Sequence, residues 1–243
     1  QGFLDSLDIP YTGSGVMASA VAMDKIISKY IYIQSGLTVP PYSIFGQNHP
    51  QNTVNELSRK HGFPCFVKCP QSGSSRLMGK ADSSDQLEEL LAELQPHASE
   101  ILVESAIKGI EFSCGVLENA DGTITSLPPI EIRPRSTFFD YTAKYTDGAS
   151  EEIVPAPYPE ELLKRIGDIA IKSHQVLGCS GFSRTDMIYC NNELYVLETN
   201  TLPGLTRNSL LPKAYKAAGG TYTSLLDTFI ESALHKKIYS SII

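Results

Sequence analysis

The sequence contains no continuous apolar stretch of the roughly 18 to 20 residues that a membrane-spanning helix requires. Its opening, QGFLDSLDIP, is neither basic nor continuously apolar, as a secretory signal peptide would be. An excess of positive charge is also missing, because 27 acidic residues outnumber 20 lysines and arginines and leave a net charge of -7. We therefore expect a cytoplasmic protein that binds neither a membrane nor the phosphates of a nucleic acid.

The cysteines do not form the pattern of a disulfide framework. There are five, an odd number, and they are widely spread along the chain. Cys65 and Cys69 lie four residues apart, but no second pair and no histidine cluster follows to complete a zinc site. We expect all five to be reduced thiols, with Cys65 and Cys69 buried as small hydrophobic side chains.

The chain has no internal repeat, and its 243 residues suffice for one large or two modest domains with their own cores. Apolar periodicity predicts helices over residues 19–35, 82–94, 159–177 and 224–234. Short β-rich runs predict strands over residues 63–68, 100–104, 111–117 and 193–198, with an extended linker at 39–42 and a long loop at 137–148. Helices mixed with hairpins favour an α+β fold over a doubly wound parallel sheet.

Residues 179–212, CSGFSRTDMIYCNNELYVLETNTLPGLTRNSLLP, hold the most informative polar groups. Side chains alternate along a strand, so Arg184 shares a face with Asp186, and Glu198 shares one with Asn200. A tight turn at the two intervening asparagines would bring all four together. Two carboxylates and an amide oxygen suit a hard cation such as Mg²⁺ or Mn²⁺. The alternative is a salt bridge on an exposed sheet face.

A loop rich in small polar residues follows the predicted strand that ends at Lys68. Gly73, Ser74 and Ser75 supply a flexible backbone and two hydroxyls, which together with the lysine suit a nucleotide phosphate. The loop is not a Walker A motif, because the lysine precedes the glycine. A plain surface loop is the alternative.

Three further cations, Lys25, Lys144 and Arg184, have no carboxylate partner at helical spacing. Each alone would be solvated. Beside a set of oxygen ligands they favour an ATP-dependent enzyme, because Mg²⁺ is commonly held by one or two carboxylates together with substrate phosphates.

Five motifs, MASAVAMDK, FVKCPQSGSS, FFDYTAKY, SRTD and LETNTLPGLTRNSLLPK, occur in the order and spacing of D-alanine–D-alanine ligases of the ATP-grasp family. The chain resembles this family over essentially its whole length. The resemblance implies an ATP-grasp fold of the α+β class, in which two α/β subdomains clasp ATP between antiparallel sheets. These subdomains would comprise residues 24–110 and 111–243, after a linker and the remnant of an N-terminal domain at 1–23.

The resemblance also implies how ATP is bound. Lys25 and Lys68 match the lysines that hold its phosphates, and Glu111 matches the acid that binds the ribose hydroxyls. The small loop over the phosphates would contain Ser74 and Ser75. The hinge segment that contacts adenine would be Glu104, Ser105, Ala106 and Ile107. Two Mg²⁺ or Mn²⁺ ions would be held by Asp186, Glu198 and Asn200.

The implied reaction activates one D-alanine as an acyl phosphate, which the amine of a second D-alanine attacks, for peptidoglycan precursor synthesis. Arg184 and the backbone N–H of Gly204 match groups around the reacting acyl centre. Ser209 and Leu210 match the positions that receive the carboxylate of the second D-alanine. The remaining catalytic positions lie in loops over the site, namely Ser74, Lys144 and Tyr145.

The sequence departs from the family pattern at several points. The family's ligases have an additional N-terminal domain, so we expect that domain or a fused enzyme, D-alanine and a second copy of the chain as partners. Ser105 replaces a lysine of the adenine segment, and Cys69 and Arg76-Leu77 alter the phosphate loop. Two other readings stay open: a ligase that takes D-serine or D-lactate as second substrate, and a nucleotide-binding module without catalysis.

Overall fold

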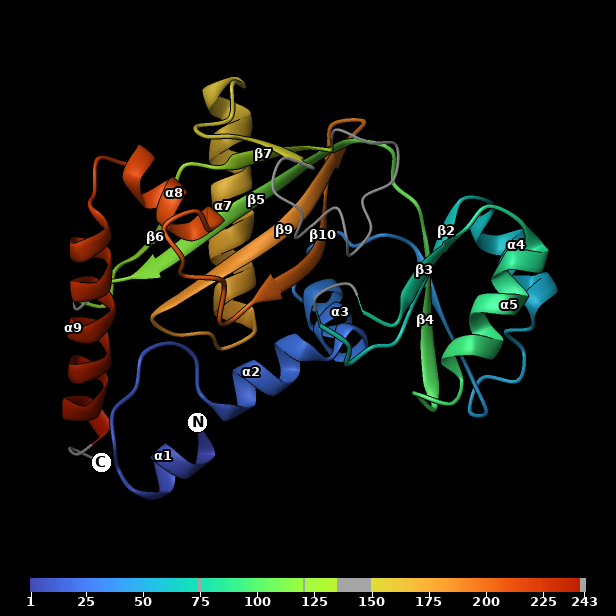
Figure 1. Cartoon of the computed structure of the whole chain (residues 1–243), viewed down its shortest axis with the longest axis horizontal. Helices are drawn as coiled ribbons and strands as arrows, with labels where there is room; N and C mark the ends of the chain where they lie inside the picture. Colours follow the sequence, from blue (N-terminus) through green and yellow to red (C-terminus); the bar gives the residue numbers. More distant parts are fainter. Residues whose placement is uncertain (74–75, 120, 135–149, 241–243) are drawn as a thin grey trace.

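The computed structural model describes residues 1–73, 76–119, 121–134 and 150–240, which form two antiparallel sheets with helices packed around them (Figure 1). The smaller sheet has the strand order β1-β4-β2-β3, and the larger has the order β10-β9-β5-β7-β8 with β6 beside β5. Every pairing in both sheets is antiparallel. The expected α+β class is confirmed, while the subdomain boundaries stay a prediction.

The smaller sheet buries one face under two helices. Alternation along β2 places Cys65 and Val67 in this core, with Leu87 and Leu91 of α5 against them. The opposite face of β2 therefore presents Lys68 to the space between the sheets. The elements are β1 (Tyr42–Gly46), α4 (Val54–His61), β2 (Cys65–Lys68), β3 (Met78–Ala81), α5 (Ser84–Leu94) and β4 (Glu100–Ser105).

The larger sheet is covered differently on its two faces. Phe112 and Met187 pack on one face against Ile166 of α7, while α8 and α9 cover one end of the other face, where Phe182 stacks on Phe229. The rest of that second face looks toward the smaller sheet (Figure 1) and presents both carboxylates, such as Glu111 and Asp186, and apolar side chains such as Ile188. The elements are β5 (Ile110–Glu118), β6 (Ile124–Ser126), β7 (Ile130–Pro134), β8 (Ser150–Ile153), α7 (Glu160–Val176), β9 (Phe182–Cys190), β10 (Glu193–Asn200), α8 (Leu210–Ala217) and α9 (Tyr222–Ser240).

The predicted helix over residues 19–35 is wrong in one respect, because it consists of two helices that meet at Asp24. Asp24 has an extended backbone, and its carboxylate accepts hydrogen bonds from the N–H groups of Ile26 and Ile27 at 3.0 and 3.1 Å. An N-cap of this kind starts a new helix and interrupts the old one. The N-terminal elements are α1 (Gly2–Ser6), α2 (Val16–Met23) and α3 (Lys25–Gln34).

Helix α3 lies between the two sheets (Figure 1). Ile26 packs with Ile44 and Leu102 of the smaller sheet, while Tyr32 packs with Val196 of the larger one. Tyr32 also donates a 2.8 Å hydrogen bond to Thr199. The helix therefore sets the position of one sheet relative to the other.

The hairpin predicted at the two asparagines is confirmed. Asn191 and Asn192 have φ values of 50° and 63°, as a tight turn requires, and they join β9 to β10. The linker expected at 39–42 is wrong at Tyr42, which begins β1 because it pairs with Glu104. The sequence reading missed short elements such as β3, α4 and α8, and the loop expected at 137–148 lies outside the described residues. Nowhere in the described ranges does a helix have the length and apolarity to cross a membrane.

Candidate active site

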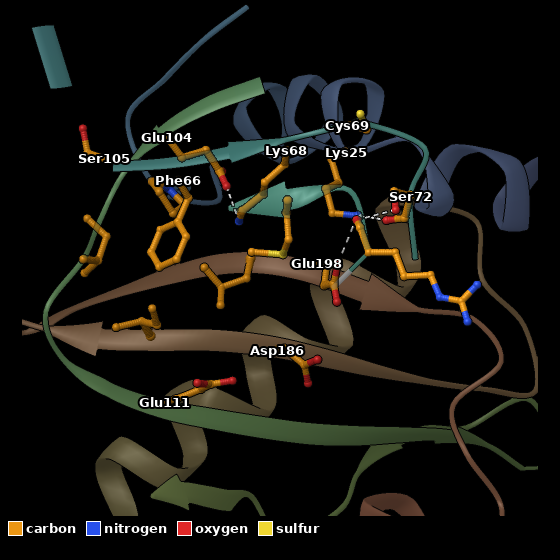
Figure 2. Close-up of a pocket in the computed structure, with 16 residues that line it drawn as sticks. Lys25, Phe66, Lys68, Cys69, Ser72, Glu104, Ser105, Glu111, Asp186 and Glu198 are labelled. Carbon is orange, nitrogen blue, oxygen red and sulfur yellow. Dashed lines mark hydrogen bonds and ion pairs between the residues drawn. The ribbon is translucent and has the colours of Figure 1, made fainter. Parts of the chain in front are cut away.

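A cleft between the two sheets collects side chains from both (Figure 2). Its lining includes apolar side chains, among them Phe66, Met78 and Ile188. It also includes the lysines of α3 and β2 and carboxylates from both sheets, with Glu104 on the smaller one and Glu111, Asp186 and Glu198 on the larger. The lining residues expected from the sequence are Lys25, Lys68, Glu104, Ser105, Ile107, Glu111, Asp186 and Glu198.

Lys25, the first residue of α3, lines the cleft. Its ammonium donates a 2.7 Å hydrogen bond to the Ser72 carbonyl and lies 3.5 Å from the Glu198 carboxylate (Figure 2). Its side chain is only 14% exposed. Lys25 is therefore not the solvated cation that it would be alone, and its carboxylate partner comes from a distant strand. Lys25 links the loop after β2 to β10.

Lys68 reaches the cleft as part of a buried charge cluster. One oxygen of Glu104 pairs with Lys68, and the other lies 2.5 Å from the ammonium of Lys29. Burial alone would raise the pKa of Glu104, but the two lysines outweigh it and lower that pKa to about 2. Burial lowers the pKa of Lys29, against the opposing effect of Glu104. The Glu104 carboxylate is thus engaged by lysines, and a contact between Glu104 and adenine stays a prediction.

The sequence reading missed Lys29. A signal was present, because Lys29 falls three residues after Ile26 and three before Tyr32, on the buried stripe of α3. A lysine on such a stripe is expected to have a buried partner.

Ser105 is oriented by a chain of hydrogen bonds. Lys60, which can only donate, gives a 2.8 Å hydrogen bond to the Ser43 hydroxyl, and His61 lies 2.9 Å from Ser43 through Nε2 and 2.9 Å from Ser105 through Nδ1. Burial lowers the pKa of His61, which favours the neutral form of the ring. If Ser43 donates to Nε2, then Nδ1–H donates to Ser105, and every group is satisfied. The Ser105 hydroxyl hydrogen is then free to donate into the cleft.

Asp186 is the centre of the polar cluster on the larger sheet. Its carboxylate accepts hydrogen bonds from Ser113 at 2.6 Å, from Arg184 at 3.0 and 2.8 Å, and from the Asn200 amide nitrogen at 3.3 Å. Burial would lower the pKa of Arg184, but Asp186 outweighs it and raises that pKa. The prediction that Arg184 shares a face with Asp186 is confirmed, so Arg184 is not the solvated cation that it would be alone.

The oxygen ligands proposed for a metal ion lie on neighbouring strands. Glu198 and Asp186 are register partners, and Asn200 is the register partner of Arg184. The described part of the chain contains no group of three or more His, Cys, Asp or Glu side chains suited to a metal ion. Two carboxylates with a nearby amide nevertheless fit a hard cation that takes its remaining ligands from phosphates and water. The assignment of a metal to these residues stays a prediction.

The residues proposed for the second substrate lie together at the start of α8. A Cβ added to Gly204 would lie 2.9 Å from the Ser209 hydroxyl, so the two residues are in contact. Ser209 is the N-cap residue of α8, and its hydroxyl lies 2.8 Å from that of Thr206. Leu210 is the first residue of the helix.

Helix α8 packs on the same face of the larger sheet that carries Arg184. A Cβ added to Gly115 would lie 2.5 Å from a methyl of Leu211, and Gly115 is the register partner of Arg184. Gly115 shares its face with Ser113, whose hydroxyl reaches Asp186. The segment from Asn200 to α8 therefore runs away from the carboxylates of Asp186 and Glu198. It then returns to the face of the larger sheet on which Arg184 lies.

We expect Gly115→Ala to lower the free energy of unfolding by about 1–3 kcal/mol, because the added methyl overpacks the contact with Leu211. Urea unfolding measures the effect. In the background of Leu211→Ala the same change should cost much less. Gly2→Ala is the control, since its added Cβ would meet Val16 at an ordinary 3.5 Å. Equal stability of Gly115→Ala and the unmodified protein would contradict the close seating of α8.

Some expected residues are not brought to the cleft or are not described. Ala106 is not among the residues that line it. Ser74, Ser75, Lys144 and Tyr145 lie outside the described residues, and their roles stay predictions. Several lining residues were given no role from the sequence, although they lie in or next to the FVKCPQSGSS motif, among them Phe66, Ser72 and Arg76.

Two antiparallel sheets around a cleft that collects lysines and carboxylates are the architecture of an ATP-grasp enzyme. A profile of the family described as "D-ala D-ala ligase C-terminus" matches residues 31–231. A D-alanine–D-alanine ligase of Leptospira interrogans is 44% identical over 98% of this chain and 70% of its own length. One from Syntrophobacter fumaroxidans is also 44% identical, over 96% of this chain and 75% of its own. The chain belongs to the D-alanine–D-alanine ligase family.

Solved structures agree with this assignment. The D-alanine–D-alanine ligase of Bacillus anthracis complexed with ATP superposes with a TM-score of 0.83 at 37% identity, covering 99% of this chain and 76% of that one. A D-Ala:D-Ser ligase from Enterococcus faecalis, VanG, has a TM-score of 0.83 at 33% identity, over 94% of this chain and 66% of its own. The ATP-grasp fold inferred from the sequence motifs is confirmed.

Proposed function

We propose that this protein joins two molecules of D-alanine into D-alanyl-D-alanine with ATP, through an acyl phosphate, and so supplies a precursor of peptidoglycan. The observation that carries the proposal is the cleft in which Lys25 and Lys68 face Asp186 and Glu198 (Figure 2). Phosphoryl transfer requires little more than alignment of the reactants and neutralisation of charge. Cations and oxygen ligands in one cleft supply both.

Different residues of the cleft would bind the adenine, the ribose and the phosphates of ATP. The apolar side chains of Phe66 and Ile188 suit the adenine ring, and the hydroxyl of Ser105 suits a ring nitrogen that accepts a hydrogen bond. Glu111 would accept from the ribose hydroxyls. Lys25 and Lys68 would hold the phosphates. Mg²⁺ ions bound at Asp186, Glu198 and Asn200 would neutralise charge on the transferred phosphoryl group.

The reacting carboxyl group is assigned to the space between β9 and the start of α8. Arg184 and the backbone N–H of Gly204 would donate to the oxyanion of the tetrahedral intermediate. Ser209, with Leu210 beside it, would bind the carboxylate of the second D-alanine. Lys144 and Tyr145 would close over the acyl phosphate and exclude water.

The experiment is a coupled assay of ADP release by the natural full-length protein that contains this chain. We expect ADP to form only when D-alanine is present, in proportion to D-alanyl-D-alanine measured by mass spectrometry. ATP binding without any ligation would instead favour a nucleotide-binding module. The control is L-alanine, which has the same charges and the wrong configuration.

A ligase that takes D-serine as the second substrate is the other candidate, favoured by the likeness to the D-Ala:D-Ser ligase from Enterococcus faecalis. Competition between D-alanine, D-serine and D-lactate in one reaction distinguishes the two. We expect D-alanyl-D-alanine as the main product, and a mixed product in excess would overturn that choice of second substrate.

We also propose that the enzyme works in the cytoplasm as a homodimer. The family resemblance supports both statements. The cytoplasmic location is also supported by the reaction's need for ATP, which cells hold in the cytoplasm. Light scattering of the purified full-length protein tests the dimer, and fractionation of cells tests the location.

A further inference from the structure

Beside the cleft lies the buried cluster of Lys29, Glu104 and Lys68. We propose that Lys29 is a positioning residue for ATP: it neutralises Glu104, so that Lys68 keeps a net positive charge for the phosphates. The inference rests on the proposed function, because it takes Lys68 to be a phosphate ligand.

The three side chains come from three elements and meet at one carboxylate. Glu104 is on β4, Lys68 on β2 and Lys29 on α3. Each lysine pairs with its own carboxylate oxygen, Lys29 with Oε1 and Lys68 with Oε2. The side chains of Lys29 and Glu104 are 1% and 3% exposed, and that of Lys68 is 16% exposed.

The two lysines differ in their position relative to the cleft. Lys68 lines the cleft, with its ammonium 5.4 Å from the centre of the Phe66 ring. Lys29 is not among the lining residues, and its ammonium lies 5.8 Å from the ring centre of Tyr42. Lys29 therefore acts on a bound nucleotide through Glu104 and Lys68, without touching it.

The charges of the cluster show what Lys29 contributes. Two ammonium groups and one carboxylate sum to a single positive charge, and the accessible member is Lys68. Without Lys29 the remaining pair would be neutral, and Glu104 would compete with the phosphates for Lys68. Coulombic interactions are strong among buried groups because little water screens them, so this competition weakens phosphate binding.

A purely structural role for Lys29 has different consequences. Lys29 joins α3 to the smaller sheet, so its loss would loosen the fold and weaken the binding of every ligand alike. The charge role affects ligands according to their phosphates, and it disappears when Glu104 is also neutral. A double-mutant cycle separates the two roles.

The experiment measures the dissociation constants of ATP and adenosine by calorimetry in the full-length protein without D-alanine. Lys29→Met is introduced into the unmodified protein and into the Glu104→Gln variant. In the unmodified protein we expect Lys29→Met to weaken ATP binding at least about tenfold, because a charge-assisted contact is lost. In the Glu104→Gln variant we expect less than about a threefold effect. Adenosine binding should change little in either background.

Two further variants keep the result interpretable. Lys164→Met removes an exposed lysine that pairs with Asp168, and it should leave both ligands unaffected. If thermal unfolding shows that Lys29→Met does not fold, Lys29→Gln takes its place with the same expectations, since it removes the charge and retains a hydrogen-bond donor.

Lys68→Ala distinguishes failure of the inference from failure of the proposed function. If Lys68→Ala leaves ATP binding unchanged, the phosphate role of Lys68 is wrong, and the inference falls with it. If Lys68→Ala weakens ATP while Lys29→Met has the same effect in both backgrounds, or weakens adenosine equally, the inference alone is overturned and Lys29 is structural.

Discussion

Replacing Asp186 by asparagine is expected to lower kcat at least about a thousandfold, because the neutral amide removes both the charge of the proposed metal ligand and the counter-ion of Arg184. Asp186 accepts two hydrogen bonds from Arg184 and one from Ser113. We expect that Arg184, without its carboxylate partner, would turn away from the proposed reacting centre. Steady-state kinetics at several Mg²⁺ concentrations provide the measurement, and the Mg²⁺ required for half-maximal rate should rise.

Asp168→Asn is the matched control for this prediction. It makes the same chemical change in an exposed pair with Lys164 on α7, where a salt bridge contributes little. Ser113→Ala should have an intermediate effect, since it removes one hydrogen bond and leaves the charge of Asp186 in place. Turnover in Asp186→Asn close to that of the unmodified protein would refute both the metal and the counter-ion roles.

The second large effect is expected for stability. Glu104→Gln should lower the free energy of unfolding by about 3–5 kcal/mol, because it leaves Lys29 and Lys68 near each other in a buried place without a counter-ion. Urea unfolding at pH 7 measures this change. Glu56→Gln is the control, since the Glu56 pair with Arg59 is exposed. A loss no larger than that of the control would show that the cluster does not stabilise the fold.

The same variant should change the response to acid. The pKa of Glu104 is lowered from 4.5 to about 2 in the folded protein. Its stabilising effect is therefore fully present above the ordinary pKa and disappears as the pH falls through the folded value. At about 1.4 kcal/mol per pKa unit, the difference corresponds to roughly 3 kcal/mol. Between pH 5 and pH 2 the unmodified protein should lose this contribution, and Glu104→Gln should not.

The larger part of the candidate site could be predicted from residues near one another in the chain. Alternation along one strand predicted that Arg184 and Asp186 share a face, and the asparagine turn predicted the strand that brings Glu198 beside them. The structure pairs Asp186 with Glu198 across the hairpin. These relations depend on the period of a strand and on a local turn, which short-range sequence determines.

Other parts of the site depended on contacts between distant segments. Lys25 and Glu198 are 173 positions apart in the sequence and come within 3.5 Å. Their pairing results from the packing of α3 between the sheets, which no periodicity expresses. The interruption of the helix at Asp24 was also missed, because the apolar pattern does not predict whether an aspartate within it caps a helix.

The sequence by itself thus determined the α+β class, the hairpin of β9 and β10, the carboxylates on one face of it and, through its motifs, the ligase family. The tertiary structure decided which charges meet: Lys25 with Glu198, and Lys29 with Glu104 and Lys68. The physical reason is the distance along the chain over which each kind of interaction acts. Strand alternation and turn geometry act over a few residues, whereas a buried ion pair forms where separate elements pack together and exclude water.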